Sequence, residues 1–177
     1  QSLMESIPRV SDALVAQAVS NTIWSIAVLR YEFPSGRDLV PLLVELARER
    51  AQTMIPQEIS NTMWAVGVLR LRGPDVEVMC AVLLNEAHKQ LKRAKPQDLE
   101  QLCWGLAVVG VKDDISMEEV AMDVSKWSRT SCFLVLPQVV CAYAKLGLRN
   151  RDLVRVVASN LEPDLRDLRD GNICALA

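Results

Sequence analysis

The chain has 177 residues, of which 22 are acidic and 20 are Lys or Arg, so its formal net charge is −2. Half of the residues are hydrophobic and 5% are aromatic. This composition excludes an intrinsically disordered chain and a uniformly basic nucleic-acid-binding tail, and the length allows one or two ordinary domains. No apolar stretch approaches the roughly 18 residues that a transmembrane helix needs.

The two ends of the sequence carry no recognisable signals. The first residues lack a basic segment followed by an apolar segment, so no targeting signal is predicted there. The chain ends at Ala177 within an apolar run, without a helix cap or a stop signal. We therefore expect the sequence to be an excerpt of a longer protein.

One motif recurs along the chain at a nearly constant interval. Its three clearest copies read NTIWSIAVLR from residue 21, NTMWAVGVLR from residue 61 and QLCWGLAVVG from residue 101. Their tryptophans, Trp24, Trp64 and Trp104, are about 40 residues apart. A fourth copy begins at Gln138, with Cys141 in place of tryptophan, and a partial fifth copy occupies residues 171–177. Repeats of this length are typical of arrays of helical hairpins.

Each copy of the motif is expected to lie on a helix, because Pro56 and Pro96 precede two copies and proline is favoured at the first helical position. These motif helices are predicted at residues 16–30, 56–70, 96–109 and 134–146, with a partial one at 165–177. Between them, apolar residues recur three and four positions apart, which predicts amphipathic helices at 37–52, 76–92, 116–127 and 150–161. Ser116 and Glu119 form a capping box that opens the third of these.

The motif helices are apolar almost all round and therefore have to be covered on several sides. Residues one and three positions after each Trp or Cys are small, so neighbouring helices can approach closely. These pairs are Ser25 and Ala27, Ala65 and Gly67, Gly105 and Ala107, Ala142 and Ala144, and Ala175 and Ala177. We therefore predict an all-α fold, an α-solenoid of about four to five stacked helical hairpins that forms one repeat array over residues 1–177.

The sequence contains no catalytic or metal-binding motif. It lacks a glycine-rich phosphate loop, a nucleophile elbow and a histidine-centred triad, and His88 is its one histidine. The five cysteines form no CxxC pair, and Cys80, Cys103, Cys141 and Cys174 lie in apolar runs where we expect buried, reduced thiols. Asp113 and Asp114 are interpreted as a helix-start pair. We predict no enzymatic activity, no metal and no cofactor.

An amide side chain recurs three residues before each Trp or Cys. These residues are Asn21, Asn61, Gln101 and Gln138. Such an amide can bond to the backbone of the next repeat and form an internal ladder, or it can present donors and acceptors to the edge of a base. The tryptophans offer a similar choice between stacking on bases and filling the core. Their helical spacing and small neighbours favour the core.

Cations cluster where the amphipathic helices end. They are Arg48, Arg50, Lys89, Lys92, Arg93, Lys95, Lys126 and Arg129. Interaction with the helix dipole accounts for this placement, since acids cluster at the helix starts. If the hairpins stack in parallel, however, the same cations also form a basic stripe along one edge, partly cancelled by Glu58, Asp98 and Glu100.

The pattern Pro-Gln-x-hydrophobic-x-Asn-x-x-Trp-Ala-x-Ala/Gly-x-Leu, seen best at residues 56–69 and 96–109, resembles the octotricopeptide repeat family. It is also similar to the heptatricopeptide-like helical repeats of proteins that carry a RAP domain. The resemblance covers nearly the whole chain. It implies an organellar protein, of the mitochondrion or chloroplast, that acts in RNA stability, processing or translation. The recurring Asn and Gln residues match the repeat consensus of these families.

Two functional hypotheses remain open at this point. The first is binding of single-stranded or ribosomal RNA, with about one base per helical repeat and hence about four or five nucleotides. The second is a protein-interaction scaffold, a subunit of an organellar ribosome or another large assembly, because stacked hairpins offer long surfaces to any ligand. The position of the cations relative to the amides is the observation that bears most directly on the choice.

Overall fold

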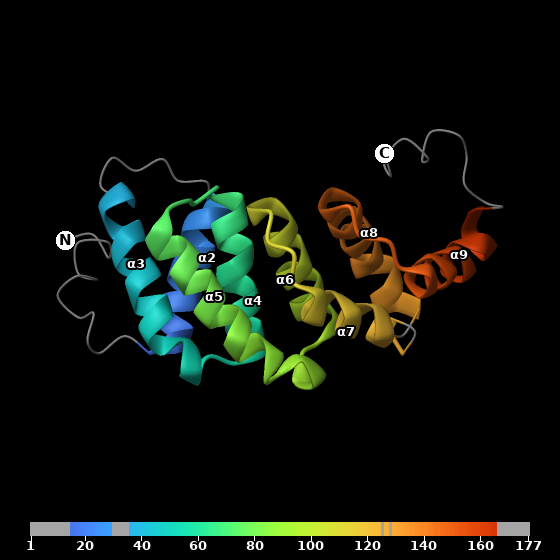
Figure 1. The fold of residues 1–177 in the computed structure, drawn as a ribbon, viewed down its shortest axis with the longest axis horizontal. Helices are drawn as coiled ribbons and strands as arrows, with labels where there is room; N and C mark the ends of the chain where they lie inside the picture. Colours follow the sequence, from blue (N-terminus) through green and yellow to red (C-terminus); the bar gives the residue numbers. More distant parts are fainter. Residues whose placement is uncertain (1–14, 30–35, 125, 128, 166–177) are drawn as a thin grey trace.

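The computed structural model describes residues 15–29, 36–124, 126–127 and 129–165 (Figure 1). Within these ranges the chain is all-helical and contains no strand, as predicted. Four helices carry the repeated motif: α2 (Ala16–Leu29), α4 (Pro56–Val68), α6 (Pro96–Val109) and α8 (Arg129–Leu146). Four others alternate with them: α3 (Gly36–Arg50), α5 (Pro74–His88), α7 (Asp114–Val124) and α9 (Arg151–Leu165). Two short 3-10 helices, η3 (Ala51–Thr53) and η4 (Leu91–Arg93), precede α4 and α6.

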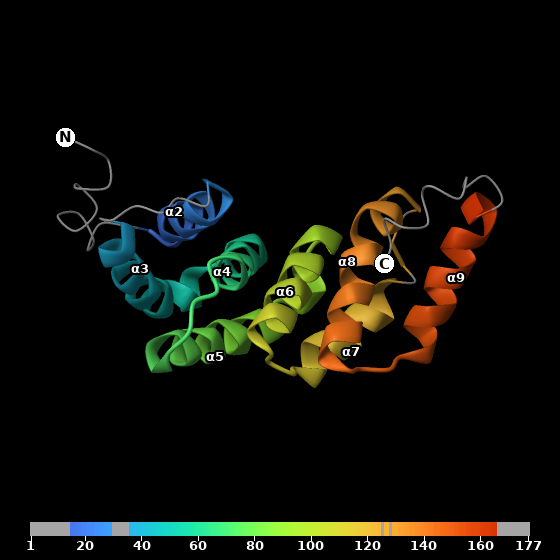
Figure 2. The same ribbon diagram turned by 90° about the horizontal axis from the view of Figure 1, so that it is seen from above.

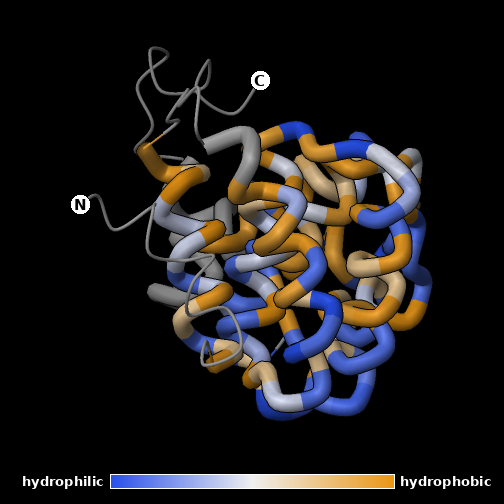
Figure 3. The backbone as a smooth tube through the Cα atoms, turned by 90° about the vertical axis from the view of Figure 1, so that its left-hand side faces the viewer, coloured by the Kyte–Doolittle hydropathy of each residue, from blue (hydrophilic) through white to orange (hydrophobic). Residues whose placement is uncertain are grey.

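The helices form two layers. Helices α2, α4, α6 and α8 lie side by side in chain order and each packs on the next; we call them the motif layer (Figure 2). Helices α3, α5 and α7 lie on one side of it, and α9 packs against α7 and α8; we call these four the covering layer. Most of the buried apolar side chains belong to one continuous core. Figure 3 shows hydrophobic and hydrophilic stretches alternating along the helices, as packing on one side requires.

Helices of the motif layer run parallel to one another, because contacts between them join residues about 40 positions apart. The rings of Trp64 and Trp104 are in contact. About one turn before these tryptophans, the hydroxyl of Ser60 on α4 donates a hydrogen bond to the side chain of Gln101 on α6. A methyl group added to Gly105 would lie only 2.6 Å from the carbonyl oxygen of Met63. The small residues of the motif therefore allow close approach, as their spacing predicted.

The motif helices α4 and α6 are capped at their N-termini in the same way. Pro56 and Pro96 occupy the first helical position. The carboxylate of Glu58 accepts a hydrogen bond from the backbone N–H of Ile55 at 2.9 Å, and that of Asp98 accepts one from Lys95 at 2.9 Å. Both carboxylates are therefore engaged at the helix starts, and both residues are buried.

Several predicted boundaries are wrong. The second amphipathic helix ends at His88 rather than at 92, and the fourth extends to Leu165 rather than to 161. The third amphipathic helix begins at Asp114, because the carboxylate of Asp113 accepts the backbone N–H of Ser116 and takes the capping role that we assigned to Ser116. The fourth motif helix begins at Arg129 rather than at 134. At the place of Pro56 and Pro96 this repeat has Phe133, which does not interrupt a helix. The predicted partial helix at 165–177 lies, beyond Leu165, outside the described residues.

Candidate ligand-binding face of the motif layer

One side of the motif layer presents equivalent residues of successive repeats in rows. Each helix contributes up to four such residues, separated in turn by four, three and four positions, and residues at these spacings lie on one face of a helix. The rows are Gln17, Gln57 and Gln97; Asn21, Asn61, Gln101 and Gln138; Trp24, Trp64, Trp104 and Cys141; and Val28, Val68, Val108 and Lys145. All of these residues are exposed or half-buried. We call this surface the repeat face.

The tryptophans form a continuous row rather than separate core side chains. Ring centroids are 6.4 Å apart between Trp24 and Trp64 and 6.0 Å apart between Trp64 and Trp104, with interplanar angles of 37° and 36°. The ring of Trp104 also fits against Gly67, where an added methyl group would lie 2.8 Å from it. Trp24 remains 37% exposed. The expectation of buried core wedges is therefore wrong for Trp24 and holds only in part for the other two.

The row ends differently at α8. Lys145 lies over the ring of Trp104, with its Nζ 5.9 Å from the ring centroid, which is within the range of a cation–π interaction. Cys141 takes the place of the next tryptophan and is exposed, which contradicts the prediction of a buried thiol there. Its place on the repeat face, which the other layer does not cover, explains the exposure.

The other cysteines fall into two groups. Cys80 and Cys103 are buried, as predicted. Burial raises the pKa of the Cys80 thiol to about 11 and that of the Cys103 thiol to about 12. The side chain of Cys132 and the whole of Cys174 lie outside the described part of the chain.

Hydrogen bonds between neighbouring motif helices come from a serine one position before the amide. Ser20 Oγ donates to the backbone oxygen of Glu58 at 2.9 Å, and Ser60 Oγ donates to the side-chain oxygen of Gln101 at 3.3 Å. Within the described ranges, Asn21, Asn61 and Gln138 make no hydrogen bond to a neighbouring repeat through their side chains. A backbone ladder of amides, one of the two alternatives, is therefore not formed by these residues.

Half of the predicted cations are paired with acids nearby in the chain. Arg48 pairs with Glu45, and Lys126 pairs with Asp123. Arg50 lies 3.2 Å from Glu49, and Lys89 lies 2.6 Å from Glu86. Each of these pairs cancels its own charge locally, so these four residues do not form the continuous basic stripe that the sequence suggested.

Three other cations remain together. Lys92 and Arg93 lie on η4, and Lys95 caps the start of α6, the helix that carries Gln101 and Trp104. All three are exposed, and the structure shows no ion pair for them among the residues it describes. We call them the η4 basic segment. The side chain of Arg129, the last predicted cation, is outside the described ones.

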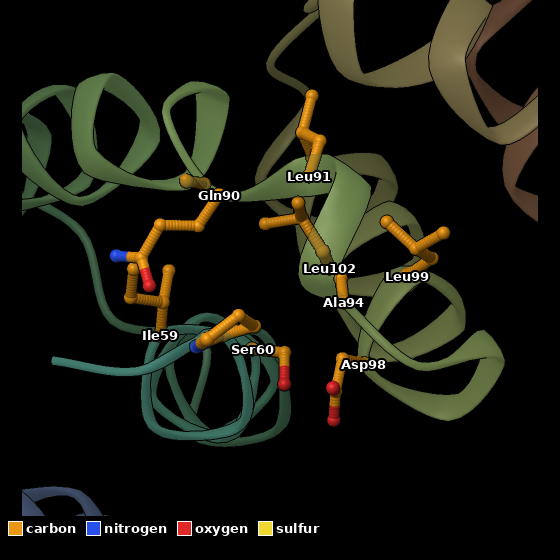
Figure 4. A pocket seen from close by; sticks show the side chains of 10 residues that line it. Ile59, Ser60, Gln90, Leu91, Ala94, Asp98, Leu99 and Leu102 are labelled. Carbon is orange, nitrogen blue, oxygen red and sulfur yellow. The ribbon is translucent and has the colours of Figure 1, made fainter.

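Two hollows lie away from the repeat face. A cavity of about 10 Å³ between α4, η4 and α6 is lined by Ser60, Asp98 and several apolar residues and has room for about one water molecule (Figure 4). An open cleft of about 600 Å³ between α7 and α9 is lined by Glu118, Met122 and the exposed ion pair of Asp152 with Arg155, among others. In the described part of the chain no group of three His, Cys, Asp or Glu residues could hold a metal ion.

Comparisons with known proteins add no family: no family model matches the chain, and no curated protein is significantly similar to it. Across the helices that the structure describes, none has the length and apolar character needed to cross a membrane.

Proposed function

We propose that this chain is an α-solenoid whose repeat face binds single-stranded RNA in a mitochondrion or chloroplast, where it supports RNA maturation, stability or translation. The observation that carries this proposal is the amide row. Asn21, Asn61 and Gln138 present side-chain donors and acceptors that no neighbouring repeat uses, at the same position of successive parallel helices. A surface with one such group per repeat suits a polymer with one base per step.

The chemistry of the neighbouring rows supports the same ligand. An amide can both donate and accept, which is what the edge of a base requires, and the half-exposed indole rings offer apolar surface one turn away. The resemblance to octotricopeptide and RAP-type repeats, where such arrays act on organellar RNA, supports the organelle and the process.

The η4 basic segment supplies the attraction to phosphate. Lys92, Arg93 and Lys95 lie immediately before α6, the helix that carries Gln101, and in this proposal their side chains bind the phosphates of the strand. Because four of the other predicted cations are paired with acids, the electrostatic contribution is expected to be modest, in keeping with a chain whose net charge is −2.

A fluorescence-anisotropy titration of the chain with a labelled random single-stranded RNA pool tests the proposal. Asn21→Ala combined with Asn61→Ala is expected to weaken binding at least several-fold, whereas Gln52→Ala, an exposed amide outside the repeat face, should leave it unchanged. Absence of binding at low salt, or equal loss in both variants, would contradict RNA recognition by the repeat face.

The salt dependence separates the basic segment from the amides. Each phosphate contact in single-stranded nucleic acid contributes about 0.7 to the slope of log K against log salt concentration. Replacing Lys92, Arg93 and Lys95 with alanine is therefore expected to reduce the slope by up to about 2. The matched control replaces Lys112, Arg149 and Arg151, three exposed cations for which the structure shows no ion pair among the residues it describes, and should leave the slope unchanged.

The second candidate function is a protein-interaction scaffold in an organellar ribosome or another assembly. A specific observation favours it: α2 and the residue before it expose the large apolar side chains of Val15, Trp24, Val28 and Leu29. Apolar groups gathered on a surface are typical of protein contacts. Recovery of stoichiometric protein partners from its organelle after nuclease treatment, by a chain that fails to bind RNA, would establish the scaffold instead.

A further inference from the structure

Glu100 occupies the position directly before the amide, where the first two repeats have a serine. Ser20 and Ser60 are buried, and each donates a hydrogen bond to the next motif helix. Glu100 is half-buried, and among the residues that the structure describes none donates a hydrogen bond or an ion pair to its carboxyl group. The third repeat therefore has a free acceptor where the first two have a satisfied hydroxyl.

This carboxyl group also differs from the two acids that cap the motif helices. Glu58 and Asp98 each accept a backbone N–H group at 2.9 Å. Glu100 is partly removed from water without such compensation, and this burial raises the pKa of its carboxyl group. A carboxylate in this situation gains from a ligand that brings a hydrogen-bond donor.

Glu100 lies at the rim of the repeat face. On α6 it follows Gln97 by three positions and precedes Trp104 by four, and residues at these spacings are neighbours on the surface of a helix. Gln97 is exposed and Trp104 is half-buried, and both belong to the rows of the repeat face. A ligand on this face therefore meets the carboxylate together with the amides and the indole.

The packing of the motif layer directs Glu100 toward Gln138 on α8. In the repeat before it, Ser60 donates to Gln101 of the following helix. Helix α8 packs on α6, and Ala142, the residue after the motif cysteine, is only 1% exposed, as its equivalent in α4 also is buried. Gln138 itself is exposed. The step between α6 and α8 thus combines a carboxylate, which only accepts, with an amide, which also donates.

The row of indoles ends at this same step. Trp64 has an indole on both sides, whereas Trp104 has the exposed Cys141 in place of an indole on its α8 side. Lys145 is exposed, and its Nζ lies 5.9 Å from the centroid of the Trp104 ring. A nucleotide at this step therefore has both apolar ring surface and a cation for its phosphate within the same small area.

We propose that the step between α6 and α8 selects a base with an exocyclic amino group, which among the pyrimidines means cytosine rather than uracil; this rests on the proposed binding of RNA by the repeat face. The amino group of cytosine donates to the carboxylate of Glu100, and the amide of Gln138 donates to the adjacent ring nitrogen. Uracil presents a carbonyl oxygen instead of the amino group, and a carboxylate repels it. The amides of the other repeats can donate or accept, so they suit both pyrimidines.

Fluorescence anisotropy of the full chain with labelled oligocytidylate and oligouridylate of equal length tests the assignment. We expect oligocytidylate to bind at least about fivefold more tightly, the lower end of what one matched base contact contributes. Glu100→Gln keeps the shape of the side chain but can donate as well as accept, so the ratio of the two affinities should fall to about one. Glu77→Gln removes the same charge from an exposed position of the covering layer and should keep the ratio.

A second variant guards against a change in folding. Glu100→Ser gives α6 the residue that the first two repeats have at this position, so it should melt like the unaltered chain and also lose the preference. Equal binding of both oligonucleotides by the unaltered chain, a preference that survives in either Glu100 variant, or its loss in Glu77→Gln would overturn selection by Glu100 while RNA binding stands. If neither oligonucleotide nor a random RNA pool binds, the proposed function itself fails, and this selection with it.

Discussion

Gly105 approaches Met63 so closely that its hydrogen stands where no methyl group fits. A Cβ atom on Gly105 would lie 2.6 Å from the carbonyl oxygen and 2.8 Å from the carbonyl carbon of Met63. Both of these are backbone atoms of α4, which a rotamer change cannot move aside. At this point the close approach of α4 and α6 therefore requires a residue without a side chain.

We expect Gly105→Ala to destabilise the fold by about 1 to 3 kcal/mol, the range for overpacking. The sign is informative, because helix propensity alone would favour alanine by about 1 kcal/mol. The free energy of unfolding from urea denaturation measures the effect. Ser25→Ala is the matched control at the equivalent exposed position of α2 and should be neutral or slightly stabilising. A stabilised Gly105→Ala protein would show that the helices can separate at no cost.

The tryptophan row predicts that two equivalent substitutions destabilise the fold by different amounts. Trp64 contacts an indole ring on both sides, whereas Trp24 contacts one indole ring and is 37% exposed. Trp64→Ala is therefore expected to lower the free energy of unfolding by about 2 to 3 kcal/mol, and Trp24→Ala by about 1 kcal/mol. Urea denaturation followed by far-UV circular dichroism gives both values. Equal losses in the two variants would mean that the contacts within the row contribute little.

The repeat period predicted most of the helices, because period 3.6 and the proline positions depend on local sequence. It failed at the start of α8, where Phe133 replaces the proline, and at α7, where Asp113 outcompetes Ser116 as the cap. At α7 the choice between two compatible starts depends on one hydrogen bond, whereas at α8 the sequence lacks the proline that marks the start in two other repeats. The alternation of two layers depends on contacts between repeats, which no single helix encodes.

The sequence indicates which residues of the candidate site share a helix face, but not what lies around that face. The sequence placed Asn61 and Trp64 on one helix face, yet it did not reveal that this face stays uncovered. The pairing of Lys89 with Glu86 could have been read from their three-residue spacing, which is the signal that we missed. The hydrogen bond from Ser20 to the backbone oxygen of Glu58 depends on the spacing between helices, so no local pattern indicated it.

We expect the exposed Cys141 of the repeat face to react faster with alkylating reagents than the buried Cys80 and Cys103. Burial raises the pKa values of Cys80 and Cys103 to about 11 and about 12, so at pH 8 they are almost entirely protonated and also shielded. In a Cys132→Ser, Cys174→Ser background, iodoacetamide should label Cys141 in the native protein and the other two only after unfolding. Mass spectrometry of the peptides measures the order of labelling. Early labelling of Cys103 would contradict the packing of α6.

Asp113 predicts how stability responds to acid. Partial burial by itself raises the pKa of this carboxyl, but hydrogen bonds from Ser116 and His88 outweigh burial and hold the pKa below its ordinary value. Because the pKa is lower in the folded than in the unfolded state, the ionised carboxylate stabilises the fold above the unfolded pKa. That contribution is lost as the pH falls through the folded pKa.

Two variants separate the charge of Asp113 from its capping role. Asp113→Asn keeps a good cap but removes the charge, so we expect a small loss of unfolding free energy at pH 7 and a weaker decline of stability between neutral and acidic pH. Asp113→Ala removes both and is expected to cost about 0.5 to 2 kcal/mol at pH 7. Urea denaturation at a series of pH values measures both effects. An acid decline as steep in Asp113→Asn as in the unaltered chain would show that other carboxylates govern it.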